Sequence, residues 1–97
     1  MIANTMQGSM IVKVKADSRI HLGINLQEIR KQKGMTQIEI VRELQLRGFA
    51  VEKQNYSRYE KEQEHISAAV LVAVCEILGI TLEDAFKENN NKQEVDR

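Results

Sequence analysis

Residues 35–61 read MTQIEIVRELQLRGFAVEKQNYSRYEK, and the other predicted elements are arranged around this stretch. Thr36 and Glu39 have the spacing of a capping box, in which each side chain accepts a hydrogen bond from the other residue's backbone N–H. Apolar residues follow at helical spacing, and Gly48 can adopt the left-handed conformation that ends a helix. The stretch therefore predicts a helix beginning at Thr36, a long turn, and a second helix within residues 52–61.

The second of these helices has an apolar face and a polar face. Its inward-facing residues are expected to be Val51, Tyr56 and Tyr59. Its outward-facing residues all carry hydrogen-bonding groups: Lys53, Gln54, Ser57 and Arg58. Such groups bind base edges and phosphates. The polar face also lacks the Glu-to-Lys pairs that stabilise a purely solvent-facing helix, so it favours a contact with nucleic acid.

Three further helices are predicted around this pair. The first covers residues 18–33, with Asp17 or Ser18 as its N-cap and Gly34 just beyond its end. The last two are expected to start at hydroxyl caps, Ser67 and Thr81. The sequence of 97 residues has no Pro, no Trp and five Gly, a composition that favours helices over a sandwich or barrel. We therefore predict an all-α fold, a compact bundle of five short helices in one domain over residues 18–87.

The two ends of the chain are predicted to lie outside this domain. Residues 10–15 alternate like a strand, but a single short strand has no evident partner. Residues 1–17 could be disordered, an arm on a partner subunit, or a strand in a two-chain sheet, and we favour a flexible or partner-dependent arm. Residues 88–97 lose all periodicity, so we expect a disordered tail.

Several functional classes are not supported by the sequence. His21 and His65 are isolated from other metal-binding residue types, and no glycine-rich phosphate loop is present, so we expect neither an enzyme nor a metal or cofactor site. No apolar run reaches the ~18 residues that span a bilayer, and the first residues do not resemble a signal peptide. Cys75 is the one cysteine, which fits a core position in a cytoplasmic protein. No segment for sensing a small-molecule effector is evident.

The net charge is zero, but the charges are unevenly distributed. Residues 19–61 carry nine cations and five anions, a net charge of +4, whereas residues 62–97 carry three cations and eight anions, a net charge of −5. A basic half suits the binding of nucleic acid through one face. The alternative is ordinary scatter of charged residues along a short chain.

Three segments together resemble the lambda-repressor-like, or Xre-type, helix-turn-helix family. They are LGINLQEIRKQKGMTQIEI at 22–40, NYSRYE at 55–60 and SAAVLVAVCEILGITLEDAF at 67–86. The resemblance covers about residues 20–87 and lies in several motifs at compatible spacing. It implies a five-helix bundle whose second and third helices bind DNA, in a protein that commonly binds its operator as a homodimer.

The resemblance also assigns roles to individual residues. It implies base reading by Lys53, Gln54 and Arg58, with Asn55 and Ser57 as neighbouring base or phosphate contacts. Gln37 matches a glutamine that holds a phosphate at the start of the second helix. Arg30 and Glu60 match a pair that links the first helix to the end of the third, and we predict a semi-buried salt bridge there.

The sequence departs from the family pattern at three places. The turn between the second and third helices is about three residues longer than usual. Glu52 stands where Ser or Thr normally caps the third helix. The segment 61–64, KEQE, replaces an Asn-Gly followed by a basic residue, and its carboxylates are expected to repel the DNA backbone.

The function predicted from these features is that of a sequence-specific DNA-binding transcriptional regulator. It would act as a repressor, with its third helix in the major groove of double-stranded DNA and with two copies forming a homodimer. The alternative is a protein–protein interaction module, antitoxin-like or the partner of a repressor, that uses the same fold without strong DNA binding. The operator sequence, the regulated genes and the dimer surface do not follow from the residues.

Overall fold

Five helices form the framework of the protein in a computed structural model, which describes residues 13–14 and 19–88. They are α1 (Leu22–Gln32), α2 (Gln37–Leu46), α3 (Lys53–Glu60), α4 (Ala68–Leu78) and α5 (Leu82–Ala85). Two strands of two residues each, β1 (Lys13–Val14) and β2 (Ile66–Ser67), form an antiparallel pair. The predicted all-α bundle of five helices is confirmed, with this short strand pair as an addition.

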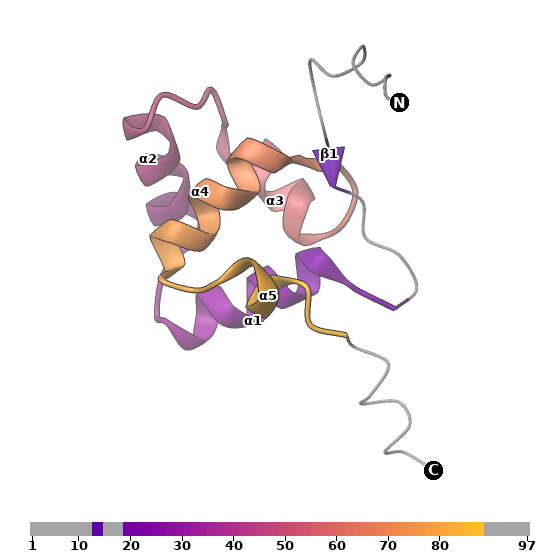
Figure 1. Ribbon diagram of the computed structural model, residues 1–97. Coiled ribbons are helices and arrows are strands. Elements are labelled where there is room, and N and C mark those ends of the chain that lie inside the picture. Colours follow the sequence, from indigo (N-terminus) through magenta and orange to yellow (C-terminus); the bar gives the residue numbers. More distant parts are fainter. Residues whose placement is uncertain (1–12, 15–18, 89–97) are drawn as a thin grey trace, which may run out of the picture.

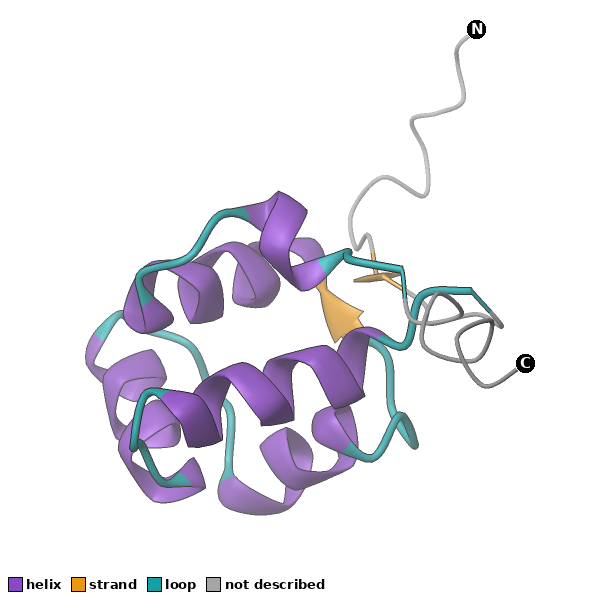
Figure 2. Ribbon diagram, turned by 90° about the horizontal axis from the view of Figure 1, so that it is seen from below, coloured by secondary structure: helices purple, strands orange, loops and turns teal. Residues whose placement is uncertain are grey.

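The helices pack so that α3 is held from two sides. It contacts both α1 and α2, while α4 packs against α2 and α5 (Figure 1). Figure 2 shows the strand pair at one end of the bundle, where β2 directly precedes α4. The arrangement supports one face of α3 on the bundle and leaves its other face outside.

The core is centred on α4, the most apolar helix of the chain. Six of its eleven residues are buried: Val70, Leu71, Ala73, Val74, Cys75 and Leu78. Burial raises the pKa of the Cys75 thiol, so this cysteine stays protonated in the core, as its predicted structural role requires. None of the helices in residues 13–14 and 19–88 is long and apolar enough to cross a membrane.

Three helices start at the hydroxyl caps that the sequence predicts. Thr36 Oγ1 accepts a hydrogen bond from Glu39 N at 3.1 Å, and Glu39 Oε1 accepts one from Thr36 N at 2.9 Å. Thr81 and Asp84 form the same box at 3.1 and 3.0 Å. Ser67 Oγ accepts from the backbone of the first turn of α4 at 3.2 Å. These caps satisfy backbone N–H groups that a helix start otherwise leaves unpaired.

Loss of the α2 cap should have a moderate and measurable effect on stability. We expect Thr36→Ala to lower the free energy of unfolding by about 1 kcal/mol, the usual effect of removing a capping hydroxyl. Urea unfolding followed by circular dichroism gives the value. Thr36→Ser keeps the acceptor and should stay close to the wild type. Equal losses in the two variants would show that the hydroxyl does not act as a cap.

The predicted start of the first helix is wrong, and the strand-like segment has a partner that we did not consider. The first helix does not start at Asp17 or Ser18, which lie outside the described residues. It starts at Leu22, with His21 at the N-cap and no side-chain cap from that residue. The strand-like segment finds a partner in its own chain, because Lys13 and Val14 pair with Ser67 and Ile66. The rest of residues 1–17, and residues 89–97, lie outside the described part of the chain.

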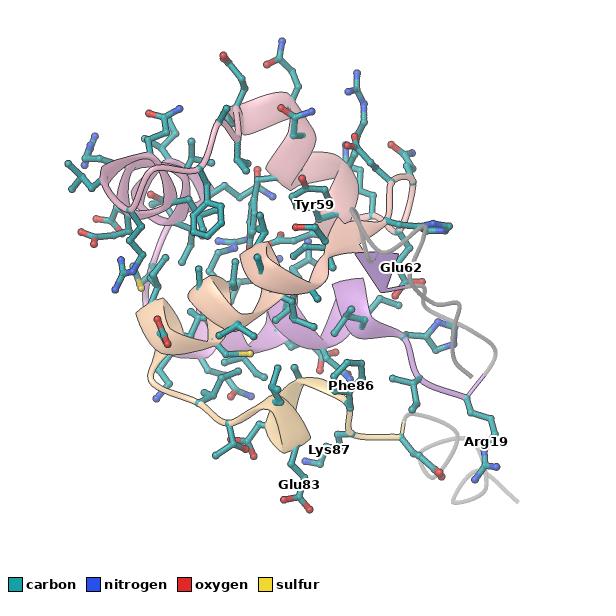
Figure 3. All side chains as sticks on the ribbon, turned by 45° about the horizontal axis from the view of Figure 1, so that its top comes forward. Arg19, Tyr59, Glu62, Glu83, Phe86 and Lys87 are labelled. Carbon is teal, nitrogen blue, oxygen red and sulfur yellow. The ribbon has the colours of Figure 1, made fainter. Side chains whose placement is uncertain are left out.

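Contacts with α1 hold the C-terminal part of the bundle in place. The buried Asn25 side chain donates from Nδ2 to the backbone oxygens of Ala85 at 2.8 Å and Lys87 at 2.9 Å. Arg19 Nη2 lies 2.6 Å from Glu88 Oε2 on the surface. Figure 3 shows Phe86 on the side of α5 that faces α1. These bonds fix α5 on the side of α1 opposite to α3.

Candidate nucleic-acid interface

The outer face of α3 carries most of the residues predicted to contact DNA. Lys53, Gln54 and Arg58 are exposed, and Ser57 between them is half-buried. They line an open pocket of about 370 Å³ together with Lys61 and Gln63 from the loop that follows. Side chains on this part of α3 point away from the other helices (Figure 3). A cationic and amide-bearing surface on one helix can bind phosphates and base edges.

The opposite face of α3 is fixed in the core. Tyr56 is fully buried, and its ring meets the half-buried ring of Tyr59 edge to face, with centroids 6.1 Å apart. Edge-to-face contacts of this kind are favourable because the ring edge and the ring face carry opposite partial charges. Val51, at the end of the turn, is buried as well. The helix therefore cannot rotate without breaking core contacts.

A buried ion pair links α1 to the last residue of α3. Arg30 Nε lies 2.7 Å from Glu60 Oε2, and Arg30 Nη2 lies 3.0 Å from Glu60 Oε1. Arg30 Nη1 also donates to the backbone oxygen of Met35 at 2.8 Å. The side chains are 9% and 0% exposed, so the pair is more deeply buried than the semi-buried bridge we predicted. The hydrogen bond with Glu60 raises the pKa of Arg30, which keeps its charge.

Gln37, to which the family resemblance assigns a phosphate contact, has a hydrogen-bond partner within the protein. Its Nε2 donates to Glu60 Oε1 at 2.9 Å, so the first residue of α2 is bonded to the last residue of α3. One carboxylate thus joins three helices. Sequence reasoning paired Glu60 with Arg30 and missed this third member, because nothing in the local pattern places Gln37 near residue 60.

Asn55 and Glu52 form the start of α3. The Asn55 Oδ1 accepts a hydrogen bond from the backbone N–H of Glu52 at 3.0 Å, and Glu52 occupies the N-cap position. Asn55 is half-buried. The structure therefore engages the carbonyl oxygen of Asn55 in capping the helix, and separates this residue from the outward set formed by Lys53, Gln54, Ser57 and Arg58.

Glu62 ties the loop after α3 to the start of α1. Its Oε2 accepts hydrogen bonds from Gly23 N at 3.0 Å and Ile24 N at 3.3 Å, and its Oε1 lies 3.3 Å from His21 Nδ1. Figure 3 shows Glu62 beside the beginning of α1. A carboxylate is favourable at a helix N-terminus, where N–H groups are unpaired. We expected Glu62 to repel DNA, but it serves as the missing cap of α1.

The start of α1 and the end of α3 approach each other very closely at Gly23. A Cβ atom on this residue would lie 2.4 Å from the backbone oxygen of Tyr59 and 2.6 Å from that of Glu60. Side-chain carbons do not approach oxygen atoms so closely, so only glycine fits here. The requirement comes from packing, since Gly23 is an ordinary helical residue inside α1.

The outward face also has a carboxylate at its border. Arg58 Nη1 lies 3.8 Å from Glu64 Oε1, with the two side chains 52% and 31% exposed. Within residues 61–64, where we expected carboxylates to face DNA, Glu64 is next to the polar surface of α3.

These observations describe two helices joined by a turn at residues 47–52, with the second helix fixed on one side and polar on the other. A family model described as a helix-turn-helix domain matches residues 23–92. This chain belongs to the helix-turn-helix domain family. The predicted resemblance is confirmed at that level, and the match covers all five helices except Leu22, the first residue of α1.

A solved structure has the same fold as this helix-turn-helix domain. It is the crystal structure of the hypothetical transcription factor NHTF from Neisseria, which is 15% identical in sequence. The alignment covers 86% of this chain and 99% of that chain, with a TM-score of 0.62. At 15% identity, the similarity between the two structures shows that they share a fold. No curated protein matches the sequence.

One polar group in the helix-turn-helix domain is buried next to the ion pair. Within the part of the chain that the structure describes, the Tyr56 hydroxyl has no hydrogen-bond partner. Burial, and after it the charge of Glu60, raises the pKa of Tyr56, so the phenol is neutral. The neutral side chain of Tyr56 therefore contributes packing to the core. The charges of Arg30 and Glu60 balance each other beside it.

Proposed function

We propose that this helix-turn-helix domain is a sequence-specific DNA-binding transcriptional regulator that places α3 in the major groove. The observation that carries the proposal is the division of α3 into a face locked by Tyr56 and Glu60 and an exposed face with Lys53, Gln54 and Arg58. The major groove admits an α-helix and shows a distinct pattern of donors and acceptors for each base pair. The fold shared with a hypothetical transcription factor supports the same function.

The exposed residues have chemically distinct tasks in this proposal. Lys53 and Arg58 would donate to guanine N7 and O6, and the Gln54 amide would pair with adenine. Ser57 would reach a base or a phosphate. Gln37 lies at the N-terminus of α2, where backbone N–H groups favour an anion, so it would approach a phosphate while its Nε2 remains bonded to Glu60.

We further propose that the protein represses transcription as a homodimer. Two copies related by a two-fold axis would place their α3 helices in successive major grooves, about 34 Å apart along the duplex. The support is the family resemblance in the sequence, and a measurement of mass in solution, with and without a duplex, tests it. A monomeric mass in both samples would contradict it.

The second candidate function is a protein-interaction module. The observation in its favour is Glu64, which places a negative charge beside Arg58 on the surface that would meet phosphate. A salt titration separates the two functions. A DNA-binding protein loses duplex affinity steeply as salt rises. Its binding releases the cations that are condensed on the phosphates, and a higher salt concentration opposes this release. With an interaction module, selection from a random pool of duplexes would recover no sequence that binds, even at low salt.

Arg58 gives the sharpest test of the major-groove proposal. We expect Arg58→Ala to weaken binding to a selected duplex by about 1–3 kcal/mol, the usual contribution of a bidentate base contact. The melting temperature should stay unchanged, because Arg58 is half exposed and its ion pair with Glu64 is long. Fluorescence anisotropy measures the first quantity and circular dichroism the second.

The matched control is Lys87→Ala. Figure 3 shows Lys87 on the opposite side of the domain from α3, so this variant removes one positive charge away from the proposed interface. It should bind the duplex nearly as well as the wild type. If both variants lost affinity equally, overall charge would explain the binding, and Arg58 would have no specific role.

A further inference from the structure

The loop that follows α3 places the carboxylate of Glu64 next to Arg58, a cation of the proposed interface. Arg58 Nη1 and Glu64 Oε1 are 3.8 Å apart, a distance that gives an ion pair without a hydrogen bond. Both side chains retain access to solvent, with 52% of Arg58 and 31% of Glu64 exposed. Exposed pairs of this kind are weak, so a ligand group that binds the Arg58 guanidinium more strongly can displace the Glu64 carboxylate.

The position of Glu64 is set by the fold on both sides of it. Before it, Glu62 is bonded to the start of α1, and the Gln63 N–H donates to the backbone oxygen of Arg58 at 2.8 Å. After it, Ile66 is buried in the core and pairs with Val14 in the strand pair. The backbone therefore keeps the Glu64 carboxylate within reach of Arg58.

The pocket on this face is otherwise cationic. Lys53, Arg58 and Lys61 line it together with neutral polar residues, and none of the described residues that line it carries a carboxylate. Glu64, at its border, lowers the positive potential that phosphates would meet. Attraction to phosphates is independent of sequence and supplies nearly all the affinity for non-specific DNA. A carboxylate here weakens that attraction at every position along a duplex.

We propose that Glu64 is a specificity-determining residue that holds Arg58 and limits binding to non-specific DNA. The inference rests on the proposed function. A phosphate offers Arg58 an exposed, salt-screened contact like the one it already has with Glu64. A guanine in the right register offers two hydrogen bonds in the plane of the guanidinium, which favours its transfer to the base. Glu64 thereby reduces affinity for random sequences more than affinity for a selected sequence.

The test compares Glu64→Gln with the wild type on a random-sequence duplex and on a selected duplex, both at low salt. We expect the variant to bind the random duplex about threefold to tenfold more tightly, as the removal of one surface carboxylate near phosphates predicts. Its affinity for the selected duplex should rise less, so the ratio of the two affinities falls.

The matched control is Glu83→Gln, since Figure 3 shows Glu83 on the side of the domain opposite α3. This variant makes the same change in net charge and should alter the affinity for the random duplex by less than about twofold. If Glu64→Gln has no larger effect than Glu83→Gln, the inference is overturned, while duplex binding by the wild type would leave the proposed function in place.

A double-mutant cycle shows whether Glu64 acts through Arg58. In an Arg58→Ala background, Glu64→Gln should increase the affinity for the random duplex by clearly less than it does in the wild type, because the side chain that Glu64 restrains is absent and only its effect on the potential of the pocket remains. A gain as large as in the wild type would contradict the inference. Circular dichroism on each variant confirms that the domain is folded. If no variant binds any duplex, the proposed function fails and the inference fails with it.

Discussion

Replacing Glu60 with glutamine is expected to lower the free energy of unfolding by about 3 kcal/mol, the lower end of the cost of removing one partner from a buried ion pair. The change is almost isosteric, so packing stays the same. Arg30 keeps its charge but loses both charged contacts with the Glu60 carboxylate, in a position where its side chain is 9% exposed. The hydrogen bond from Gln37 also loses its charged acceptor.

Urea unfolding of Glu60→Gln gives this value, and two other variants show where it comes from. Tyr56→Phe removes a neighbouring buried hydroxyl that has no hydrogen-bond partner among the described residues, and should change stability by less than about 1 kcal/mol. Replacing the pair together, with Arg30→Met and Glu60→Leu, should cost less than Glu60→Gln alone, because no buried charge is left unpaired. A loss below about 1 kcal/mol in Glu60→Gln would show that water reaches Arg30 and replaces the carboxylate.

Replacing Gly23 with alanine is expected to destabilise the domain by about 3 kcal/mol, the upper part of the range for overpacking a well-packed position. The added Cβ would lie 2.4 and 2.6 Å from two backbone oxygens and 2.7 Å from Cγ of Glu62. The side chain of Glu62 can turn aside, but the backbone oxygens of Tyr59 and Glu60 move only if the end of α3 moves. The better helix propensity of alanine offsets a part of this cost, about 1 kcal/mol.

The same variant should also weaken DNA binding beyond its effect on folding. Moving the end of α3 away from α1 tilts the outer face of the helix, so the folded fraction of Gly23→Ala should bind a selected duplex less tightly. Lys31→Ala is the control, because it changes an exposed position on the same helix. It should stay within about 0.5 kcal/mol of the wild type in stability. Unchanged stability in Gly23→Ala would mean that α1 and α3 can separate at little cost.

The parts of the fold that the sequence predicts correctly depend on short-range signals. Thr36, Ser67 and Thr81 each act within the first turn of their own helix, so the residues next to them in sequence suffice to identify a cap. Gly79 ends α4 with φ at 73°, again a local property. Features of this kind are determined by three or four neighbouring residues and can be predicted without knowledge of the packing.

The parts that could not be predicted depend on residues far apart in the chain. The cap of α1 comes from Glu62, which follows Gly23 by 39 residues. The partner of β1 is β2, which lies more than fifty residues later. The amide of Gln37 is bonded to a carboxylate on another helix. A local pattern shows that a helix start needs an acceptor, or that a strand needs a partner, but it does not show which distant residue provides it.

The ion pair at Glu60 also limits how this domain could be given a new target. An engineer who wished to redirect it to another operator could exchange the side chains at positions 53, 54, 57 and 58, which project from one side of α3. Transplanting the whole of α3 from a relative would bring along whatever stands at position 60, and a mismatch there would strand the guanidinium of Arg30 in the interior. Retargeting this domain should therefore proceed by grafting a face and leaving the rest of the helix in place.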